Sequence, residues 1–464
     1  MMNLHLYDTK SKTKKSLAPQ EQRISLYVCG PTVYDRAHLG NARSVVVFDM
    51  LFRLLTHTHP DVCYVRNITD IDDKIIQAAH YNQESIHDLT QRTLGFFHHD
   101  MDALHAWRPT HEPRATDHVQ DMIHLISTLI DKGYAYIVAD HVMFHVKHMS
   151  HYGSLSGRSL DTQQAGARVA VDAHKRDPHD FVLWKPSHDG EPGWESPWGW
   201  GRPGWHIECS AMSHAFLPLP LTIHGGGQDL IFPHHENEQA QSCCGFDVPE
   251  LAHIWMHNGI LTVDGVKMAK SLNNFITVSD ALKRWPGEVI RWVLLSAHYR
   301  QPLDWTESKL AQAKKNLDRL YEALTYISDK EPADPPQPPQ PILSALYDDL
   351  NTPQAFKALF AQVNAVNQAA DSDERTRRAQ DVLASARLMG FAHHTPQAWF
   401  QGKTTSKSLE SHALSAQEIE QHIEDREKAR RYKDFTKADA VRQHLESQGI
   451  ILEDRHGKTT WKRR

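Results

Sequence analysis

The sequence lacks any long hydrophobic run. Nowhere in its 464 residues does an uninterrupted apolar stretch approach the roughly 18 residues that a membrane-spanning helix needs. The first residues, Met1–Leu6, also lack the apolar centre of a secretion signal. We therefore expect a cytoplasmic protein without a membrane partner.

Cysteine is scarce as well. The five cysteines are an odd number and follow no secretion signal, which argues against a disulfide framework and leaves metal binding or simple burial. Cys63 lies in an apolar strand-like segment, and Cys243 and Cys244 end a helical stretch, so we expect these three in the core. Cys29 and Cys209 have different surroundings from these three.

No sign of charge is in large excess, since the formal net charge is −6. Hydrophobic residues make up 40% and charged residues 23%, which is ordinary globular usage and excludes disordered, collagen-like and coiled-coil classes. The length predicts two to four domains at about 150 residues each. The last residues differ from this average, because twelve Lys and Arg stand against six Asp and Glu between Arg426 and Arg464. A polyanionic partner and a merely solvated charged helix both account for that tail.

The N-terminal part of the sequence predicts a strand, a helix and a second strand. Ser25–Cys29 is a short apolar run that Gly30 and Pro31 interrupt, Ser44–Leu55 is helical, and Val62–Arg66 is apolar again. Such a βαβ unit implies a parallel sheet, and ligands of parallel sheets bind beyond the carboxyl ends of the strands. Cys29 and the segment 67–70 lie at those ends. The stretch 108–202 looks like an insertion, with helical segments and then a loop-rich part. From Lys309 onward the pattern is helical and amphipathic.

Three segments carry residues suited to chemistry. The first, Cys29–Asn41, joins the first strand to the first helix, where a glycine and a helix N-terminus favour a phosphate and where His38 and Asn41 can donate hydrogen bonds. An ordinary strand-to-helix turn would read similarly. The second, Lys267–Ser271, has two lysines three residues apart that could clamp a triphosphate, although a solvated basic loop is the plainer interpretation.

The third segment pairs Trp205–Cys209 with His234–Glu238. His234 and Glu238 are four residues apart and share one face of a helix. His235 and Glu236 compete with them as ligands, and an ordinary surface helix would fit the spacing too. A chemically sensible zinc set of two sulfurs, one nitrogen and one oxygen is Cys29, Cys209, His234 and Glu238.

Taken together, these segments resemble the class I aminoacyl-tRNA synthetases, and in particular the bacterial cysteinyl-tRNA synthetases. The two class signatures correspond to His38-Leu39-Gly40-Asn41 and Lys267-Met268-Ala269-Lys270-Ser271. Segments typical of the cysteine-specific members correspond to residues 27–35, 64–74, 201–212 and 224–238. The resemblance covers nearly the whole chain.

The resemblance implies roles for individual residues. It assigns the zinc site to Cys29, Cys209, His234 and Glu238 in preference to His235 and Glu236. It assigns ATP binding to His38, Gly40, Asn41 and Lys270, and catalysis to His38, Lys267 and Lys270. It assigns the amino-acid pocket to Thr69, Trp205, His224 and Asp229. Two positions depart from the family pattern, because Asn41 replaces a histidine and Ala269 replaces a serine, and their roles are therefore open.

The resemblance also implies a fold and a reaction. The expected fold is α/β, with a doubly wound parallel-sheet (Rossmann-type) catalytic domain, an insertion, a helical bundle and a small C-terminal module. The implied domains are the catalytic halves 1–107 and 203–248, the insertion 108–202, a stem-contact region 249–308, a helical bundle 309–400 and a basic anticodon-binding module 401–464. The implied reaction is ATP-dependent attachment of L-cysteine to tRNA(Cys) through a cysteinyl-adenylate. One Zn²⁺ per chain would recognise the cysteine thiolate, Mg²⁺ would accompany ATP, and the chain would be a monomer.

Two other functions share parts of this sequence pattern. A ligase that joins cysteine to an amino sugar resembles the chain to about Trp305 but lacks the helical and basic C-terminal parts. A relative with a decayed catalytic site, binding only zinc or RNA, gains slight support from Asn41 and Ala269. Cysteine-dependent ATP–pyrophosphate exchange and tRNA charging distinguish the three.

Overall fold

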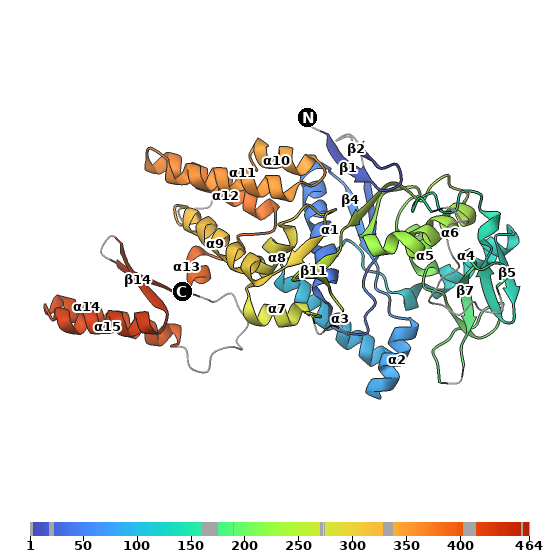
Figure 1. Cartoon of the computed structure of the whole chain (residues 1–464), viewed down its shortest axis with the longest axis horizontal. Coiled ribbons are helices and arrows are strands. Elements are labelled where there is room, and N and C mark those ends of the chain that lie inside the picture. The colour runs from blue at the N-terminus through green and yellow to red at the C-terminus, as the bar shows by residue number, and fades with distance from the viewer. Residues whose placement is uncertain are drawn as a thin grey trace. The chain divides into compact units, whose positions relative to one another are not determined.

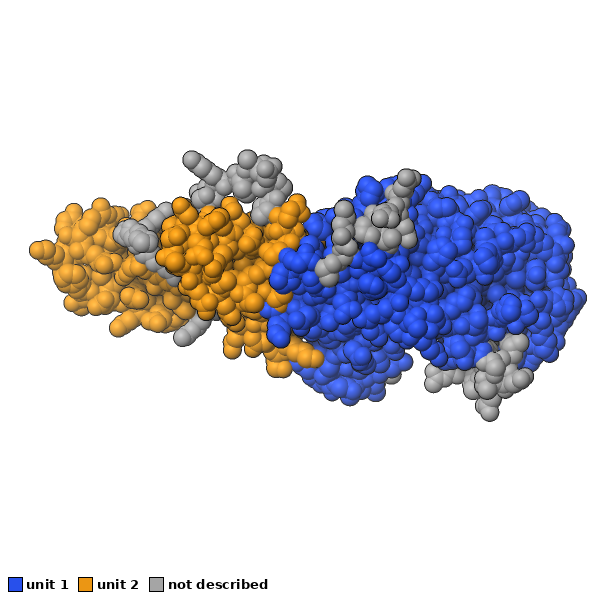
Figure 2. Space-filling model, turned by 90° about the horizontal axis from the view of Figure 1, so that it is seen from above, with its two compact units in different colours: residues 1–278, 294–306, 340–357 blue, residues 279–293, 307–339, 358–464 orange. Residues whose placement is uncertain are grey.

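A computed structural model describes residues 3–17, 23–158, 175–188, 190–269, 272, 274–327, 337–401, 414–455 and 458–463. The chain divides into two compact units (Figure 2). The first comprises residues 1–278, 294–306 and 340–357, and the second comprises residues 279–293, 307–339 and 358–464. Among the described helices, none is both long enough and apolar enough to cross a membrane.

A four-stranded parallel sheet forms the centre of the first unit (Figure 1). Its strands are β3 (Ile24–Val28), β4 (Val62–Arg66), β9 (Leu221–Gly227) and β10 (Ala252–Asn258), in the spatial order β10-β9-β3-β4. The helix α1 (Leu39–Thr58) connects β3 to β4, and β3 pairs in parallel with both β4 and β9. The predicted parallel βαβ unit and the α/β fold class are confirmed. Because β4 and β9 lie on opposite sides of β3, the carboxyl ends of β3 and β9 flank a switch point in the strand order, where ligands of such sheets bind.

Close packing of α1 on the sheet depends on a small residue. The β3 residues are all buried, and α1 presents apolar residues such as Val46, Phe48 and Leu51 to the sheet. A Cβ atom on Gly225 of β9 would lie 2.2 Å from the Phe48 ring, so only glycine lets the helix approach this closely. The switch point is therefore framed by rigid, fully buried elements.

The insertion contains a sheet that the sequence did not predict. Four antiparallel strands follow the helix α4 (Val119–Asp131): β5 (Ala135–Val138), β6 (His141–Phe144), β7 (Phe181–Pro186) and β8 (Gly201–Pro203). The loop-rich interpretation of this stretch is wrong for β7 and β8. Strand β8 is only three residues long and is rich in glycine and proline, so neither its length nor its composition predicts a strand.

Further elements of the first unit surround the two sheets. They are the hairpin β1 (Leu4–Asp8) and β2 (Thr13–Leu17), the helices α2 (Asp73–Asn82), α3 (Ile86–Ala103), α5 (Ile207–Phe216), α6 (Glu236–Phe246) and α10 (Gln340–Tyr347), and a small sheet of β11 (Leu261–Val263), β12 (Val266–Lys267) and β13 (Leu303–Trp305). Cys63 and Cys244 are buried as predicted, whereas Cys243 is half-buried.

Helices dominate the chain after residue 278, as predicted from Lys309 onward. They are α7 (Val278–Arg284), α8 (Gly287–Leu295), α9 (Glu307–Leu324), α11 (Thr352–Asn367), α12 (Ser372–Leu388), α13 (Pro396–Phe400), α14 (Ala416–Arg431) and α15 (Phe435–Ser447). A hairpin of β14 (Ile450–Arg455) and β15 (Lys458–Arg463) ends the chain and was not predicted. The C-terminal module has its own small core, in which Trp461 packs with Ile419, Ile423 and Leu445.

Candidate active site

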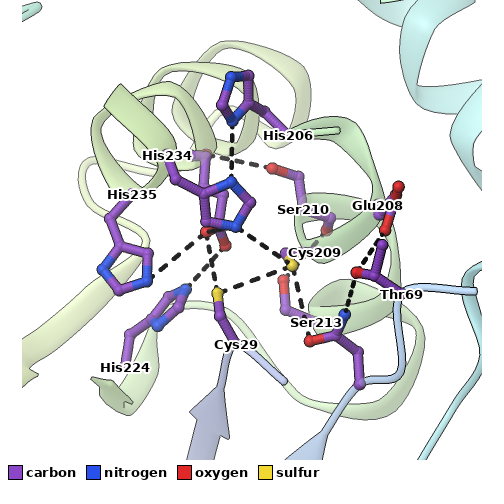
Figure 3. A network of polar contacts seen from close by, with 12 residues as sticks. Cys29, Thr69, His206, Glu208, Cys209, Ser210, Ser213, His224, His234 and His235 are labelled. Carbon is purple, nitrogen blue, oxygen red and sulfur yellow. Dashed lines mark hydrogen bonds and ion pairs between the residues drawn. The ribbon is translucent and has the colours of Figure 1, made fainter. Parts of the chain in front are cut away.

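Four side chains from four segments meet at the carboxyl edge of the parallel sheet (Figure 3). Cys29 directly follows β3, Cys209 lies in the first turn of α5, His234 lies in the turn that precedes α6, and Glu238 lies in α6. One ligand atom from each lies within 4.8 Å of the other three. The sequence separation between Cys29 and Cys209 is 180 residues, so the fold alone brings them together.

The spacing of these atoms suits a tetrahedral zinc ion. The two sulfurs lie 3.7 Å apart, and the Cys209 sulfur lies 3.6 Å from His234 Nε2. Two sulfurs that each lie about 2.3 Å from a tetrahedral zinc are about 3.8 Å apart, and a sulfur and an imidazole nitrogen are about 3.6 Å apart. His234 Nε2 and Glu238 Oε1 are 3.0 Å apart. The donor set and its dimensions therefore fit the metal that the resemblance implies.

The two competing ligands have different surroundings. Glu236 turns toward the insertion, where its carboxylate accepts hydrogen bonds from the backbone N–H groups of Gly153 and Ser156 at 2.9 and 2.8 Å. His235 stays close, with Nε2 3.9 Å from Glu238 Oε1, and belongs to a second group that could hold a metal, together with Cys29, His224 and Glu238. The structure thus brings His235, but not Glu236, to the cluster.

Electrostatics distinguishes the two thiols. The hydrogen bond with Cys29 lowers the pKa of Cys209 to about 6, so Cys209 is the first of the pair to become a thiolate. Burial raises the pKa of Cys29 well above its ordinary value. Burial also acts to raise the pKa of Glu238, but the nearby His224 and His234 outweigh it and the net pKa is lowered. Two of the four ligands are thus in the deprotonated form that zinc binding requires.

Neighbouring rings hold His234 in place. His206 Nδ1 and His234 Nδ1 lie 2.9 Å apart, and the Trp205 ring stacks on the His234 ring with centroids 4.4 Å apart. Because the Nδ1 atom of His234 is engaged with His206, its Nε2 atom points to the cluster (Figure 3). A hydrogen bond to the second ring nitrogen is the usual way in which proteins orient a metal-binding histidine.

The four residues expected in the amino-acid pocket lie in different settings. Thr69, after β4, is buried and donates a hydrogen bond from Oγ1 to Glu208 Oε2 at 2.9 Å. Trp205 has 41% of its surface exposed above His234. His224 of β9 is fully buried, with Nε2 2.9 Å from Glu238 Oε2. Asp229 is exposed in the turn that follows β9.

The first class signature caps the helix α1. His38 is the N-cap residue, and its Nδ1 accepts hydrogen bonds from the N–H groups of Gly40 and Asn41 at 3.0 and 3.3 Å. The Asn41 side-chain oxygen accepts in return from the His38 N–H at 3.1 Å, which completes a capping box. Because Nδ1 accepts, the neutral ring carries its proton on Nε2, where it can be donated to a phosphate. The oxygen of Asn41 therefore helps to hold His38 in the orientation that its predicted role requires. The amide nitrogen of Asn41 is the group that can donate a hydrogen bond to a ligand.

The segment that follows the second signature lies next to the first. The backbone N–H of Leu39 donates to the carbonyl of Ile276 at 3.1 Å, and the rings of His38 and Phe275 lie 5.2 Å apart. Lys267 is exposed at the end of β12. Asn274 braces this loop, because its side chain accepts from the Ala269 N–H at 2.8 Å and donates to the Lys267 carbonyl at 3.2 Å. Lys270 and Ser271 lie outside the described residues.

The basic tail folds into a helical hairpin rather than one helix. Arg430 and Arg431 end α14, Lys433 lies in the turn with a φ of 59°, and Lys437 lies in α15. The sequence predicts that Arg430, Arg431, Lys433 and Lys437 lie close together on one helix. This prediction is wrong, because the positive φ at Lys433 ends α14 and reverses the chain. Tyr432 and Phe435 flank the turn and are 85% and 62% exposed, whereas Trp461 is buried. The tip of this module combines cations with two exposed aromatic rings.

Reasoning from the sequence gave no role to two residues of the network, Asn67 and Glu208, although it placed the segment 67–70 at the ligand-binding ends of the strands. Asn67 Oδ1 accepts from the Gly30 N–H at 2.8 Å, and its amide donates to Thr69 Oγ1 at 3.3 Å. Its place directly after a strand was the available signal. Glu208 gave a weaker signal. Its neighbour Cys209 indicated that this helix contributes to the site, but nothing in the sequence indicated that Glu208 would contact Thr69. Burial and the neighbouring Cys209 raise the pKa of Glu208 well above its ordinary value.

Comparisons with known proteins agree with this geometry. Residues 16–315 match the family described as "tRNA synthetases class I (C) catalytic domain", and residues 343–393 match the family described as "DALR domain". A "Cysteine--tRNA ligase" of Rhodospirillum rubrum is 50% identical over 463 residues, and one of Acidiphilium cryptum is 52% identical over 464 residues, with 100% of both chains covered in each case.

Solved structures share the fold at low identity. A Mycobacterium tuberculosis methionyl-tRNA synthetase in complex with methionyl-adenylate is 13% identical, with a TM-score of 0.57 over 79% of this chain and 89% of its own. An Agrobacterium radiobacter LeuRS in a ternary complex with tRNA is 12% identical in sequence and has a TM-score of 0.58. The match covers 84% of this chain and 86% of its own. The fold and the family matches define a class I aminoacyl-tRNA synthetase. Within that class, the chain belongs to the cysteine–tRNA ligase family, as the resemblance predicted, and is an enzyme that charges tRNA.

Proposed function

We propose that this enzyme attaches L-cysteine to tRNA(Cys) in two steps, through a cysteinyl-adenylate, and that Cys29, Cys209, His234 and Glu238 hold a zinc ion that recognises the cysteine thiolate. The observation that carries the proposal is the meeting of these four donors at the switch point of the sheet. The cytoplasmic location and the monomeric state expected from the sequence stay predictions.

In the first step, the cysteine carboxylate attacks the α-phosphorus of ATP and pyrophosphate leaves. His38 donates from Nε2 to a phosphate oxygen, and the N-terminus of α1 adds favourable backbone dipoles. Lys267 and Lys270 neutralise charge that grows on the phosphates as the bond to pyrophosphate breaks. The residues of this chain thus position ATP and stabilise charge, and Mg²⁺ bound with ATP would assist them.

Recognition of cysteine depends on the chemistry of its side chain. The zinc ion, when bound, supplies a soft Lewis acid that favours a thiolate over the hydroxyl of serine. Trp205, stacked on His234 and 41% exposed, is placed to cover the amino acid from the solvent side. A pocket of the same size without a metal discriminates poorly between isosteres, so this arrangement supports selection without an editing domain.

In the second step, the terminal adenosine hydroxyl of the tRNA attacks the carbonyl carbon of the adenylate, AMP leaves and the hydroxyl proton is released. The basic tip of the C-terminal module, with Arg430, Arg431 and Lys433 beside Tyr432 and Phe435, supports a role in binding the anticodon. Cations of this kind bind phosphates, and exposed aromatic rings stack on unpaired bases.

The test is a pair of assays on the purified, metal-loaded chain. Cysteine-dependent exchange of labelled pyrophosphate into ATP reports the first step, and formation of cysteinyl-tRNA(Cys) reports the second. We expect both activities, with serine inactive in the first. Exchange without charging would favour the cysteine–amino-sugar ligase, and absence of both would favour a decayed catalytic site.

A further inference from the structure

A buried arginine of α1 joins three segments of the first unit. Arg43 has 0% of its surface exposed. Its two Nη atoms lie within hydrogen-bond distance of five backbone carbonyl oxygens, in the two segments that precede β11 and β13. The carbonyls of Ile260 and Gln301 accept at 2.5 Å, and that of Gly259 accepts at 2.8 Å. Arg43 thus fastens α1 to both segments at once.

The charge of Arg43 is offset by backbone dipoles. Among the described residues no acidic side chain pairs with it, and burial alone lowers the pKa of its guanidinium to about 10, so the group stays protonated at pH 7. Burying a charge is costly, and an apolar side chain of similar volume would fill the same space at a lower cost. An apolar side chain lacks direction, whereas the planar guanidinium fork fixes the place of each acceptor. Arg43 therefore serves to fix the geometry of the segments around it.

A small sheet extends from the carbonyls that Arg43 binds. Strand β11, which packs against α1, begins directly after Ile260, and β13 begins two residues after Gln301 (Figure 1). Lys267 of β12 lies opposite Thr262 of β11. The side chain of Asp304 in β13 accepts from Thr262 Oγ1 at 2.9 Å. A short, braced path of backbone therefore leads from Arg43 to Lys267.

The segment after the second signature returns to the same helix. The backbone N–H of Val278 donates to the carbonyl of Ala37 at 2.9 Å, directly before the N-cap residue His38. The second signature thus begins on a sheet that Arg43 fastens to α1 and leads back to the start of α1. In the proposed mechanism His38 and Lys267 act on the same ATP molecule, so their relative positions matter for the reaction.

We propose that Arg43 is a positioning residue, which holds Lys267 at a fixed place relative to the start of α1. Because Arg43 is buried, it acts through the small sheet and not on the substrates. The inference rests on the proposed function, since it needs the adenylate-forming step in which Lys267 neutralises charge. A misplacement of about 1 Å can cost on the order of 10²-fold in rate.

A double-mutant cycle on the metal-loaded full chain tests this role. Arg43→Lys keeps the charge, but one ammonium group cannot reproduce the fork that reaches both segments, so β11 and β13 lose their common anchor. We expect the kcat of cysteine-dependent pyrophosphate exchange to fall on the order of 10- to 100-fold, with the KM for cysteine and the zinc content unchanged. In a chain that already carries Lys267→Ala, the same substitution should cost no more than about 3-fold, because the group that Arg43 positions is absent.

The matched control is Arg53→Lys, the same substitution further along α1. Arg53 is 3% exposed, pairs with Asp49 at 2.9 Å and donates to the carbonyl of His105 at 2.6 Å. Neither partner belongs to the small sheet. Any rate loss from Arg53→Lys should therefore be the same factor with and without Lys267→Ala, since the effects of independent sites multiply.

A second variant and a second measurement do not depend on Arg43→Lys folding well or on activity. Gly259→Ala leaves Arg43 in place but sets a Cβ atom 2.6 Å from the carbonyl oxygen of Gln301, so it should displace the same junction and show the same dependence on Lys267. Hydrogen–deuterium exchange is measured on the unliganded chain. Arg43→Lys should speed the exchange of the amides in segment 259–267 on the order of 10-fold and leave those of β3 and β4 unchanged.

The possible outcomes separate the inference from the proposed function. Equal rate losses from Arg43→Lys with and without Lys267→Ala would make Arg43 a general support of the fold and overturn the inference, as would an unchanged rate. Faster amide exchange throughout the first unit would overturn it as well. A wild-type chain without pyrophosphate exchange would instead refute the proposed function, and the amide measurement would still decide whether Arg43 fastens the small sheet to α1.

Discussion

The salt bridge between Arg66 and Glu112 offers a quantitative test of how the end of β4 is held. Arg66 is 3% exposed and its Nη2 atom lies 2.7 Å from Glu112 Oε1, while His98 Nε2 lies 2.6 Å from Glu112 Oε2. Burial alone would raise the pKa of Glu112, but His98 and Arg66 outweigh burial and lower it to about 2, from an ordinary 4.5. Because Asn67 and Thr69 follow Arg66 within three residues, this pair anchors the segment that carries Thr69, one of the residues that we propose for the amino-acid pocket.

The perturbation is Glu112→Gln, which keeps the size and the hydrogen-bonding oxygen and removes the charge. The difference between a pKa of 4.5 and one of about 2 corresponds to about 3 kcal/mol of stability at pH 7. The 3–5 kcal/mol typical of leaving a buried partner charge unpaired agrees with this magnitude. Since the folded-state pKa is lowered, the contribution is complete above pH 4.5 and is lost as the pH falls toward 2. At pH 3.5 it should have dropped to about 2 kcal/mol.

The assay is urea unfolding followed by tryptophan fluorescence, at pH 7 and at pH 3.5. Asp102→Asn is the control, because Asp102 pairs with Arg108 at the same 2.7 Å but both side chains are exposed, and exposed pairs contribute at most about 1 kcal/mol. If Glu112→Gln costs no more than the control, or if its cost does not shrink at pH 3.5, the electrostatic reasoning is refuted.

Three further outcomes are expected. Metal analysis after dialysis should find about one zinc per chain, and Cys209→Ser should lower this content, because the thiol with the lowered pKa is replaced by a hydroxyl that zinc binds poorly; full zinc in the variant would refute the ligand set. Lys270→Ala should slow pyrophosphate exchange on the order of 10²–10³-fold while leaving cysteine binding nearly intact, because the lysine acts on charge that grows in the transition state; an unchanged exchange rate would count against that role. A chain that ends near Gly402 should keep pyrophosphate exchange and lose most tRNA charging, with a shallower dependence of tRNA binding on salt; unchanged charging would show that the tail serves only solubility.

Local sequence was sufficient wherever one segment determines its own structure. The strands around Leu26 and Tyr64 are short apolar runs between turn residues, and their burial on both faces is what a parallel sheet requires. The position of Cys29 at a strand end followed from the same pattern. The resemblance then chose among ligands that spacing alone had left open.

Contacts between distant segments could not be read from the sequence. Thr69 donates a hydrogen bond to Glu208, which lies 139 residues further along the chain. Nothing in the sequence around either residue predicts this contact. The turn at Lys433 was missed for a different reason. The residues on both sides of it are charged residues of the kind common in helices, so the composition does not change at the turn. Strand β8 was missed because three residues with glycine and proline form a strand only against a partner that the fold provides.

The distribution of the four metal-ligand candidates along the chain has a consequence for biosynthesis. Cys29 precedes the insertion, while Cys209, His234 and Glu238 all follow it. During translation the first donor is made long before the other three, so a newly made N-terminal part carries one of the four donors without the rest of the set. Bringing Cys29 and Cys209 together closes a loop of 180 residues, and the chain entropy lost in closing it is offset by the packing of the sheet and its helices. The set of four donors is therefore complete only when α5 and α6 have packed beside the end of β3, so binding of a metal by all four would report that both halves of the sheet have assembled.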